Sequence, residues 1–302
     1  MSSQTEIRQH VTNQIVESLT NGDLPPWRQP WNNDPNAPGL FTSLSTGQSY
    51  RGINQLILQA SASRQNLKSK WWGTYNQIQK CGANVRRGQK GTKIVLWKPV
   101  SRKQADKNGD EVDDRYLKVR EFSVFNAAQT TGLKQFRVGF AQPEQDTIDR
   151  HKQGDEVIEA TNADIRYGGN EAFYSPQSDF IQCPFRHQFN PSDGFYETMF
   201  HELCHWSEQR VGFDRSQTEN TFALGELIAE IGSCFMMGEL GLPMAESLDN
   251  HATYVKGWLK EMNNDPKFIF KAASQATKTV DFILSFTRSS APVVEPTVDL
   301  PF

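Results

Sequence analysis

The sequence lacks any apolar run that approaches the ~20 residues needed to cross a bilayer. Its first residues contain neither the basic region nor the apolar stretch of a secretory signal. Cysteine is scarce: Cys81, Cys183, Cys204 and Cys234 are the only four, and none forms a CxxC pair. This usage is typical of free thiols in a reducing compartment. We therefore predict a cytoplasmic protein that has no membrane partner.

Motifs of nucleotide-driven and sequence-reading proteins are also absent. The chain has no GxxxxGK[ST] sequence, so an ATP-driven activity is not indicated. It has no helix-turn-helix, zinc-finger or RNP sequence, so base-specific reading of duplex DNA is not supported.

The formal net charge of −3 over 302 residues hides a strong asymmetry along the chain. Residues 1–140 contain 20 Lys and Arg against 10 Asp and Glu, whereas residues 141–302 contain 12 against 25. Such a split predicts two domains with different partners, and the basic one suits a polyanion. We place the basic domain at residues 1–135, a linker at 136–146, the second domain at 147–288 and a disordered tail at 289–302.

Hydrophobic periodicity predicts helices and strands in both halves. The charged stretch 101–116 between two expected strands is predicted to be a flexible loop or hairpin tip. The fold class that follows is α+β, with an N-terminal α+β domain and a mainly helical C-terminal domain that carries a small sheet. Helices are expected at 5–21, 52–65, 74–81, 148–161, 192–210, 220–239, 247–263 and 265–285, and strands at 93–99, 119–126, 165–167, 172–174 and 180–182.

The most informative stretch is His201-Glu202-Leu203-Cys204-His205, an HExxH sequence inside a predicted helix. Two histidines four residues apart project from one helical face about one turn apart, so both imidazoles can reach one metal ion. Glu202 can then act as general base toward a water on the metal. Cys204 is expected to point off the ligand face as a small core residue. The spacing predicts the first half of a zincin metallopeptidase site.

A zincin needs a third protein ligand, and the next predicted helix offers Glu226 and Glu230, one turn apart. We prefer Glu226 as the ligand and Glu230 as the residue that orients a ligand histidine, and the reverse assignment stays open. The ExxA spacing resembles the third-ligand helix of gluzincin metallopeptidases, in which the first glutamate binds. The alternative is an exposed acidic helix face. The apolar neighbours of both glutamates disfavour it, because a buried carboxylate needs a partner.

The predicted cofactor is one divalent ion with water as its fourth ligand, and the predicted reaction is amide hydrolysis. An imidazole-rich site favours zinc over manganese, although metal supply can override this preference. Residues 170–184 can provide an edge strand that aligns an extended peptide. Tyr174 and Tyr196 are candidates for stabilising the oxyanion, and packing is the alternative role of both.

The basic half interleaves aromatic and cationic residues, a pattern that suits single-stranded nucleic acid with little sequence preference. Bases stack on aromatic faces while cations follow the phosphates. The glycine-punctuated turn around Gly88 and Gly91 favours phosphate contacts for its four cations. For each tryptophan, a place in the core is an equal alternative. The candidate DNA-binding residues are Trp27, Arg28, Trp31, Tyr50, Arg51, Trp71, Trp72, Tyr75, Arg86, Arg87, Lys90 and Lys93.

Taken together, the motifs resemble the ArdC family of plasmid antirestriction proteins over nearly the whole chain, from residue 5 to residue 286. The residues that carry the resemblance occur in both halves and are specific in combination. They are Pro26-Trp27 with Pro30-Trp31, Tyr50 to Asn54, Trp72 to Tyr75 with Gln77, Val85 to Thr92, Phe125-Asn126 with Gln129, Ala172 to Pro176, Phe200 to Trp206, Glu226 to Glu230, and the run from Tyr254 to Ala276.

The resemblance implies an N-terminal domain that binds single-stranded DNA, also found fused to plasmid primases, and a C-terminal zincin-like metalloprotease domain. It implies a bacterial, plasmid-encoded protein that acts in conjugation and shields the incoming plasmid from restriction enzymes. We hypothesise that DNA binding brings the protease to its protein substrates, with restriction-enzyme subunits or other DNA-bound proteins as candidates. Two other classes stay open. One is a non-catalytic protein that coats single-stranded DNA and holds a structural metal, and the other is a nuclease, which the acidic C-terminal half disfavours.

Overall fold

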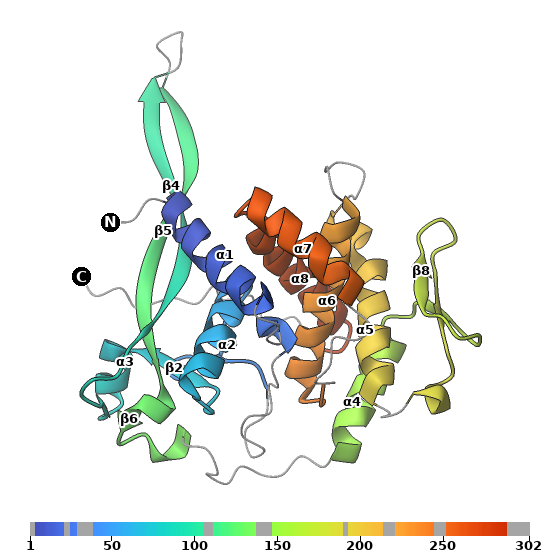
Figure 1. The fold of residues 1–302 in the computed structure, drawn as a ribbon, viewed down its shortest axis with the longest axis horizontal. Helices are drawn as coiled ribbons and strands as arrows, with labels where there is room; N and C mark the ends of the chain where they lie inside the picture. Colours follow the sequence, from blue (N-terminus) through green and yellow to red (C-terminus); the bar gives the residue numbers. More distant parts are fainter. Residues whose placement is uncertain are drawn as a thin grey trace.

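Figure 1 shows the computed structural model, which describes residues 4–20, 25–28, 39–105, 111–136, 147–189, 193–213, 221–244 and 252–288. The chain is α+β, as predicted, with most of its strands in the N-terminal half and its longest helices in the C-terminal half. The predicted linker from residue 137 onward and the predicted tail lie outside the described residues.

The described residues of the N-terminal half combine three α-helices with a mixed sheet of four strands in the order β1-β2-β5-β4. Strands β3 and β6 form a separate two-stranded sheet. Its helices, with η for a 3-10 turn, are α1 (Gln4–Thr20), η1 (Pro26–Arg28), α2 (Ile53–Gln65), the short α3 (Tyr75–Lys80), η2 (Ala127–Gln129) and η3 (Lys134–Phe136). Its strands are β1 (Thr42–Ser43), β2 (Trp71–Thr74), β3 (Asn84–Val85), β4 (Thr92–Ala105), β5 (Glu111–Asn126) and β6 (Thr130–Thr131).

Strands β4 and β5 form a long antiparallel ribbon that projects from the rest of the molecule (Figure 1). The prediction of a flexible loop or hairpin tip over residues 101–116 is wrong for 101–105 and 111–116, which continue the two strands. The register sets Arg102 against Asp114 and Lys103 against Asp113. Residues of opposite charge at paired positions favour an antiparallel ladder, so a charged sequence is compatible with two paired strands here.

The C-terminal half is a group of long helices with a small sheet at one side (Figure 1). The sheet has the order β7-β9-β8, so β8 is an edge strand, and β8 packs against α5. The helices are α4 (Thr147–Ala160), η4 (Arg186–Gln188), α5 (Asp193–Ser207), η5 (Gln209–Val211), α6 (Thr221–Leu240), α7 (Ala252–Asn264) and α8 (Phe268–Ser285). The strands are β7 (Asp164–Tyr167), β8 (Phe173–Ser175) and β9 (Phe180–Cys183).

Buried side chains from both halves form one continuous hydrophobic cluster. The stripe Ile7, Val11, Ile15 and Leu19 makes α1 amphipathic, and α1 packs on α7 while α2 packs on α8. Helix α6 is buried along most of its length and contacts α5, α7 and α8. The C-terminal helices are therefore held partly by helices of the N-terminal half.

No helix in the described part of the chain combines the length and the apolar composition that a membrane span requires.

Candidate metal centre

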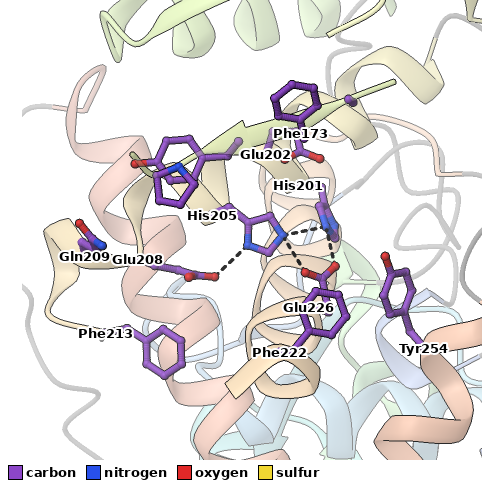
Figure 2. Close-up of a pocket in the computed structure, with 13 residues that line it drawn as sticks. Phe173, His201, Glu202, His205, Glu208, Gln209, Phe213, Phe222, Glu226 and Tyr254 are labelled. Carbon is purple, nitrogen blue, oxygen red and sulfur yellow. Dashed lines mark hydrogen bonds and ion pairs between the residues drawn. The ribbon is translucent and has the colours of Figure 1, made fainter. Parts of the chain in front are cut away.

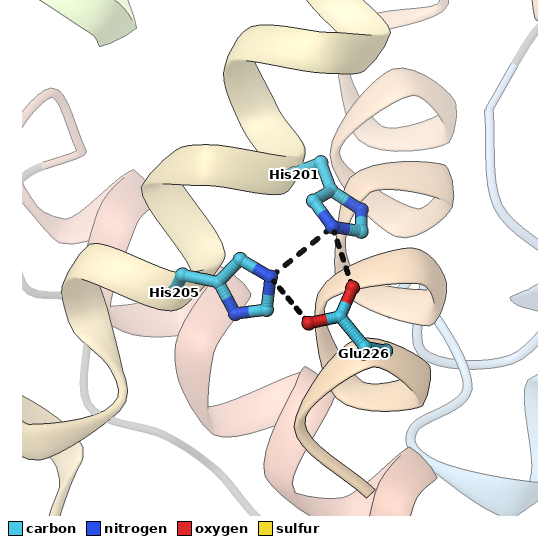
Figure 3. A group of neighbouring side chains, drawn as sticks. All are labelled: His201, His205 and Glu226. Carbon is cyan, nitrogen blue, oxygen red and sulfur yellow. Dashed lines mark hydrogen bonds and ion pairs between the residues drawn. The ribbon is translucent and has the colours of Figure 1, made fainter. Parts of the chain in front are cut away.

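Helix α5 presents His201 and His205 on one face, and α6 presents Glu226 opposite them (Figure 3). The two Nε2 atoms are 3.1 Å apart. The Glu226 carboxylate spans the pair, with Oε1 3.5 Å from Nε2 of His205 and Oε2 3.6 Å from Nε2 of His201. The candidate ligand atoms of these three residues all lie within 4.8 Å of one another.

These separations suit a divalent metal ion. A tetrahedral ion with ligand bonds of ~2.0–2.1 Å holds its ligand atoms about 3.3 Å apart. The three observed separations, 3.1, 3.5 and 3.6 Å, lie close to that value. Two imidazoles and one carboxylate are also a donor set that zinc accepts, and the carboxylate makes the set compatible with manganese. The residues therefore fit a metal without any rearrangement of the two helices.

The other ring nitrogen of His205 is held by Glu208, whose Oε1 lies 2.9 Å from Nδ1. Both side chains are buried. Burial opposes a charge on His205, but the carboxylates of Glu208 and Glu226 outweigh it and raise the histidine pKa to about 9. Burial likewise opposes a charge on Glu226, but His201 and His205 outweigh it and hold the pKa of this carboxyl well below its usual range. A metal ion would take the place of the proton that these carboxylates attract.

The contact to a candidate ligand histidine that the sequence analysis preferred for Glu230 is made by Glu208 in the structure. Glu230 instead accepts hydrogen bonds from Arg28, with Nε 2.5 Å from Oε1, and its side chain is only 1% exposed. Glu226 is the carboxylate beside the two histidines, as preferred over Glu230. Glu208 was missed, although its position three residues after His205 on the same helical face was a usable signal.

A cavity of about 340 Å³ opens over the two histidines and Glu226 (Figure 2). Glu202, which is 7% exposed, also faces this cavity, as the HExxH pattern predicts for a general base. Cys204 is fully buried and points into the core. The lining residues are Ala172, Phe173, Tyr174, Pro176, His201, Glu202, His205, Glu208, Gln209, Phe213, Phe222, Glu226 and Tyr254.

Of the two tyrosines proposed for the oxyanion, only Tyr174 lines the cavity. Its hydroxyl donates to Asp179 at 2.9 Å. Tyr196 is fully buried and donates to Asp155 at 2.9 Å, so the structure contradicts an oxyanion role for it and supports the packing alternative. A third tyrosine, Tyr254 of α7, was missed by sequence reasoning. It lines the cavity, and Figure 2 shows its ring beside His201 and Glu226.

The structure removes three residues from the candidate DNA-binding set. Trp27 and Trp72 are fully buried, so neither ring can stack on a base. Arg28 is 2% exposed and pairs with Glu197 and Glu230, so it cannot reach a phosphate. The physical reason is that the sequence does not show burial. An arginine between two buried carboxylates and a tryptophan in a core have the same residue types as a DNA-binding surface. Trp31 lies outside the described residues.

The remaining candidates differ in their exposure and in the contacts that they make. Tyr50 and Trp71 are half-buried, and the 43% exposed Arg51 pairs with Asp281. The exposed Arg86 donates to the carbonyls of Ala128 and Thr130, so it braces the loop that carries it. The loop residues Arg87 and Lys90 are exposed, as is Tyr75, which opens α3. Lys93 on β4 is also exposed and pairs with Glu121 at 3.6 Å. This exposed set is Tyr75, Arg87, Lys90 and Lys93.

Two protein-family models match the chain. One, described as the N-terminal domain of anti-restriction factor ArdC, matches residues 5–125. The other, described as a zincin-like metallopeptidase, matches residues 152–275. The second match contains all four residues of the candidate centre, from the HExxH sequence to Glu226.

Among curated proteins, the chain is 35% identical over 301 residues to the DNA primase TraC of Escherichia coli. The match covers 93% of this chain but only 27% of that primase, so the chain spans about a quarter of the length of this relative. It is also 32% identical over 292 residues to the uncharacterized protein y4eC of Sinorhizobium fredii, with 92% of each chain covered.

Among solved structures, the chain is similar to the antirestriction ArdC protein from plasmid R388. The metal-free crystal structure gives a TM-score of 0.77 at 34% identity, over 93% of this chain and 97% of that chain. The Mn(II)-bound crystal structure gives a TM-score of 0.73 at 33% identity, with the same coverage. With both halves matched, the chain belongs to the ArdC family of antirestriction proteins, with an ArdC-type N-terminal domain and a zincin-like metallopeptidase domain.

Proposed function

We propose that this chain is a metal-dependent peptidase that docks on single-stranded DNA and protects incoming conjugative plasmid DNA from restriction. The observation that carries the peptidase assignment is the convergence of His201, His205 and Glu226 on one point, with Glu202 facing the same cavity. We place the division between the DNA-binding and peptidase domains at residues 136–146, and the site of action in the bacterial cytoplasm.

His201, His205 and Glu226 would hold the metal. When bound, a divalent ion would polarise a peptide carbonyl and acidify a water molecule in the cavity. Two imidazoles and one carboxylate favour zinc, and the Mn(II)-bound form of the R388 ArdC protein supports manganese as an alternative.

Glu202 accepts the proton of the attacking water and passes it to the leaving amine. Its carboxylate is nearly buried but opens onto the cavity, so a proton can move between substrate and enzyme without exchange with bulk water. Glu208 keeps the imidazole of His205 in the tautomer that leaves Nε2 free for the metal, because it accepts the Nδ1 proton.

Strand β8 aligns the substrate. It is an edge strand of its sheet, and Phe173 and Tyr174 on it line the cavity. An extended peptide that pairs with β8 would lie across the cavity with its carbonyls near the metal centre. Tyr254, on the opposite wall, is placed to donate a hydrogen bond to the developing oxyanion.

The N-terminal half supplies the DNA contact. Its net excess of cations and the exposed Tyr75, Arg87, Lys90 and Lys93 support binding of a phosphate backbone with stacking of a base. The relatives named DNA primase TraC carry the matching region within longer proteins, which supports a shared role at DNA. Restriction-enzyme subunits and other proteins bound to the incoming strand are the proposed substrates.

The test is Glu202→Gln in the full-length protein. We expect the variant to bind metal and single-stranded DNA like the wild type, and to lose both proteolysis and protection of a conjugating plasmid. A variant that still protects the plasmid would instead support a non-catalytic protein that coats single-stranded DNA. An Arg87→Ala/Lys90→Ala variant, assayed at several salt concentrations, tests the DNA contact, because each lost phosphate contact lowers the salt dependence of binding.

A further inference from the structure

Arg28 reaches from the N-terminal half into the interior of the helical half. It lies in η1 and is 2% exposed. Its Nε lies 2.5 Å and its Nη2 3.3 Å from the two carboxylate oxygens of Glu230 on α6. Its Nη1 pairs with Glu197 on α5, whose side chain is 13% exposed. One guanidinium therefore bridges the two helices that carry the candidate metal ligands.

Both carboxylates lie one helical turn from the metal centre. Glu197 precedes His201 by four residues on α5, and Glu230 follows Glu226 by four residues on α6. Residues four apart share a helical face, so each carboxylate lies directly beyond a candidate ligand. The two helix turns that supply the ligands are thus joined through Arg28.

The residue before Arg28 supports the far wall of the same cavity. Trp27 packs edge-on against Trp258 of α7, with ring centroids 6.0 Å apart. Trp258 in turn stacks on Tyr254, with centroids 6.1 Å apart and ring planes 17° from parallel. Tyr254 lines the cavity, so η1 supports both the ligand helices and the tyrosine that faces them.

A buried ion pair of this kind orients its side chains strongly but adds little to the free energy of unfolding. Apolar residues of similar volume often stabilise a fold as well as a buried ion pair does, since desolvation offsets the attraction between the charges. A planar guanidinium, in contrast, fixes two carboxylates in a defined orientation that a lysine cannot reproduce. Burial opposes the charge on Arg28, but Cys234, Glu230 and Glu197 outweigh it and hold the pKa of Arg28 above its usual value.

We propose that Arg28 is a positioning residue of the metal centre, which sets the distance between the ligand turns of α5 and α6. The inference rests on the proposed metal binding by His201, His205 and Glu226. It means that the N-terminal half completes the metal site: without Arg28 the helical half retains all three ligands but holds them in a looser arrangement.

The test uses the full-length protein, with Co²⁺ as the probe. The visible absorption of Co²⁺ reports the geometry of its ligands, and competition with a chelator reports its affinity. The variants are Arg28→Lys, which keeps the charge, and Arg28→Met/Glu197→Gln/Glu230→Gln, which leaves no unpaired buried charge. The matched control is Arg51→Met, because Arg51 also joins the two halves through Asp281 but does so at the surface.

We expect both Arg28 variants to bind Co²⁺ at least tenfold more weakly than the wild type, with an altered visible spectrum. The triple variant is expected to melt near the wild-type temperature, which separates positioning from folding. Glu197→Gln, which removes the negative charge that Arg28 meets on α5 and leaves Glu230 in place, is expected to give a smaller change of the same kind. Arg51→Met is expected to leave affinity and spectrum unchanged.

Two results would overturn the inference, and they are distinguishable. If Arg28→Lys and the triple variant bind Co²⁺ with wild-type affinity and spectrum, Arg28 does not position the ligands, and the metal site itself stands. If the wild type fails to bind Co²⁺, or Glu226→Gln binds it equally well, the proposed metal site fails and the inference falls with it.

Discussion

Glu208 Oε1 lies 2.9 Å from Nδ1 of His205, and both side chains are more than nine-tenths buried. This contact fixes the ring and its tautomer, so that Nε2 faces His201 and Glu226. Removal of such an outer carboxylate lowers metal affinity about 10–100-fold. We expect Glu208→Ala to show a loss of this size in competition with a chromogenic chelator.

Gln209→Ala is the control for Glu208→Ala, since Gln209 lines the same cavity. Among the described residues, no hydrogen bond joins Gln209 to a ligand histidine. Its metal affinity is expected to stay within about twofold of the wild type, because it leaves the ligand shell intact. Equal losses in both variants would indicate a general disturbance of the cavity and contradict an orienting role for Glu208.

Metal binding is expected to release a proton from His205. Its pKa is raised from 6.5 to about 9, so the metal-free protein holds an imidazolium at neutral pH. This charge stabilises the metal-free fold below pH 6.5, and the stabilisation is lost as the pH rises through 9. Metal needs the neutral ring, so affinity is expected to rise with pH by up to about tenfold per unit and to level off above the raised pKa.

Calorimetric titration with Zn²⁺ at pH 8, in two buffers of different ionisation enthalpy, measures the number of protons released. Glu208→Gln removes a negative charge beside His205, which lowers the pKa of the ring, so this variant is expected to release fewer protons. Equal proton release by wild type and variant would contradict the assigned cause of the raised pKa.

The helices and the local chemistry of the site could be predicted because they depend on short-range spacing. In the structure, His201 and His205 lie on one face of a helix, as their four-residue interval predicts. Glu226 lies on a buried helix, as the apolar residues around it predict. The need for a third ligand left Glu226 and Glu230 as candidates, and the resemblance of the ExxA spacing to the third-ligand helix of gluzincin metallopeptidases favoured Glu226.

Contacts between residues far apart in the sequence could not be predicted, because composition does not show which side chains the fold buries or what packs against them. Trp27 and Arg28 suit a DNA surface in sequence, yet the fold places them against Trp258 and between Glu197 and Glu230. Tyr254 joins the site from a third helix, and no spacing rule connects it to the HExxH sequence.

Gly232 allows α6 to approach the HExxH helix closely. A Cβ at this position would lie 2.6 Å from Sγ of Cys204, which is fully buried. Alanine normally favours a helix by about 1 kcal/mol over glycine, but overpacking a core costs about 1–3 kcal/mol. We therefore expect Gly232→Ala to lower the free energy of unfolding by up to about 2 kcal/mol, measured by urea denaturation.

Gly257 on α7 offers the matched control, because a Cβ there would meet nothing within 4 Å. Gly257→Ala is expected to raise the free energy of unfolding by about 0.5–1 kcal/mol. Adding Cys204→Ala to Gly232→Ala relieves the contact and is expected to recover part of the loss. If Gly232→Ala is as stable as Gly257→Ala, close packing of the two helices is not the reason for the glycine.

Tyr254 is expected to stabilise the oxyanion, because its ring lies beside His201 and Glu226 in the cavity. Burial, together with the charges of Glu226 and Glu202, raises the pKa of this phenol, so its hydroxyl stays a donor across the working pH range. Loss of one oxyanion donor lowers kcat about 10²-fold. Tyr254→Phe is therefore expected to lower kcat on a fluorogenic peptide by about this factor, with KM and metal affinity unchanged.

Tyr174→Phe is the comparison, since the hydroxyl of Tyr174 already donates to Asp179. A larger loss of kcat in Tyr174→Phe than in Tyr254→Phe would assign the oxyanion role to the β8 tyrosine instead.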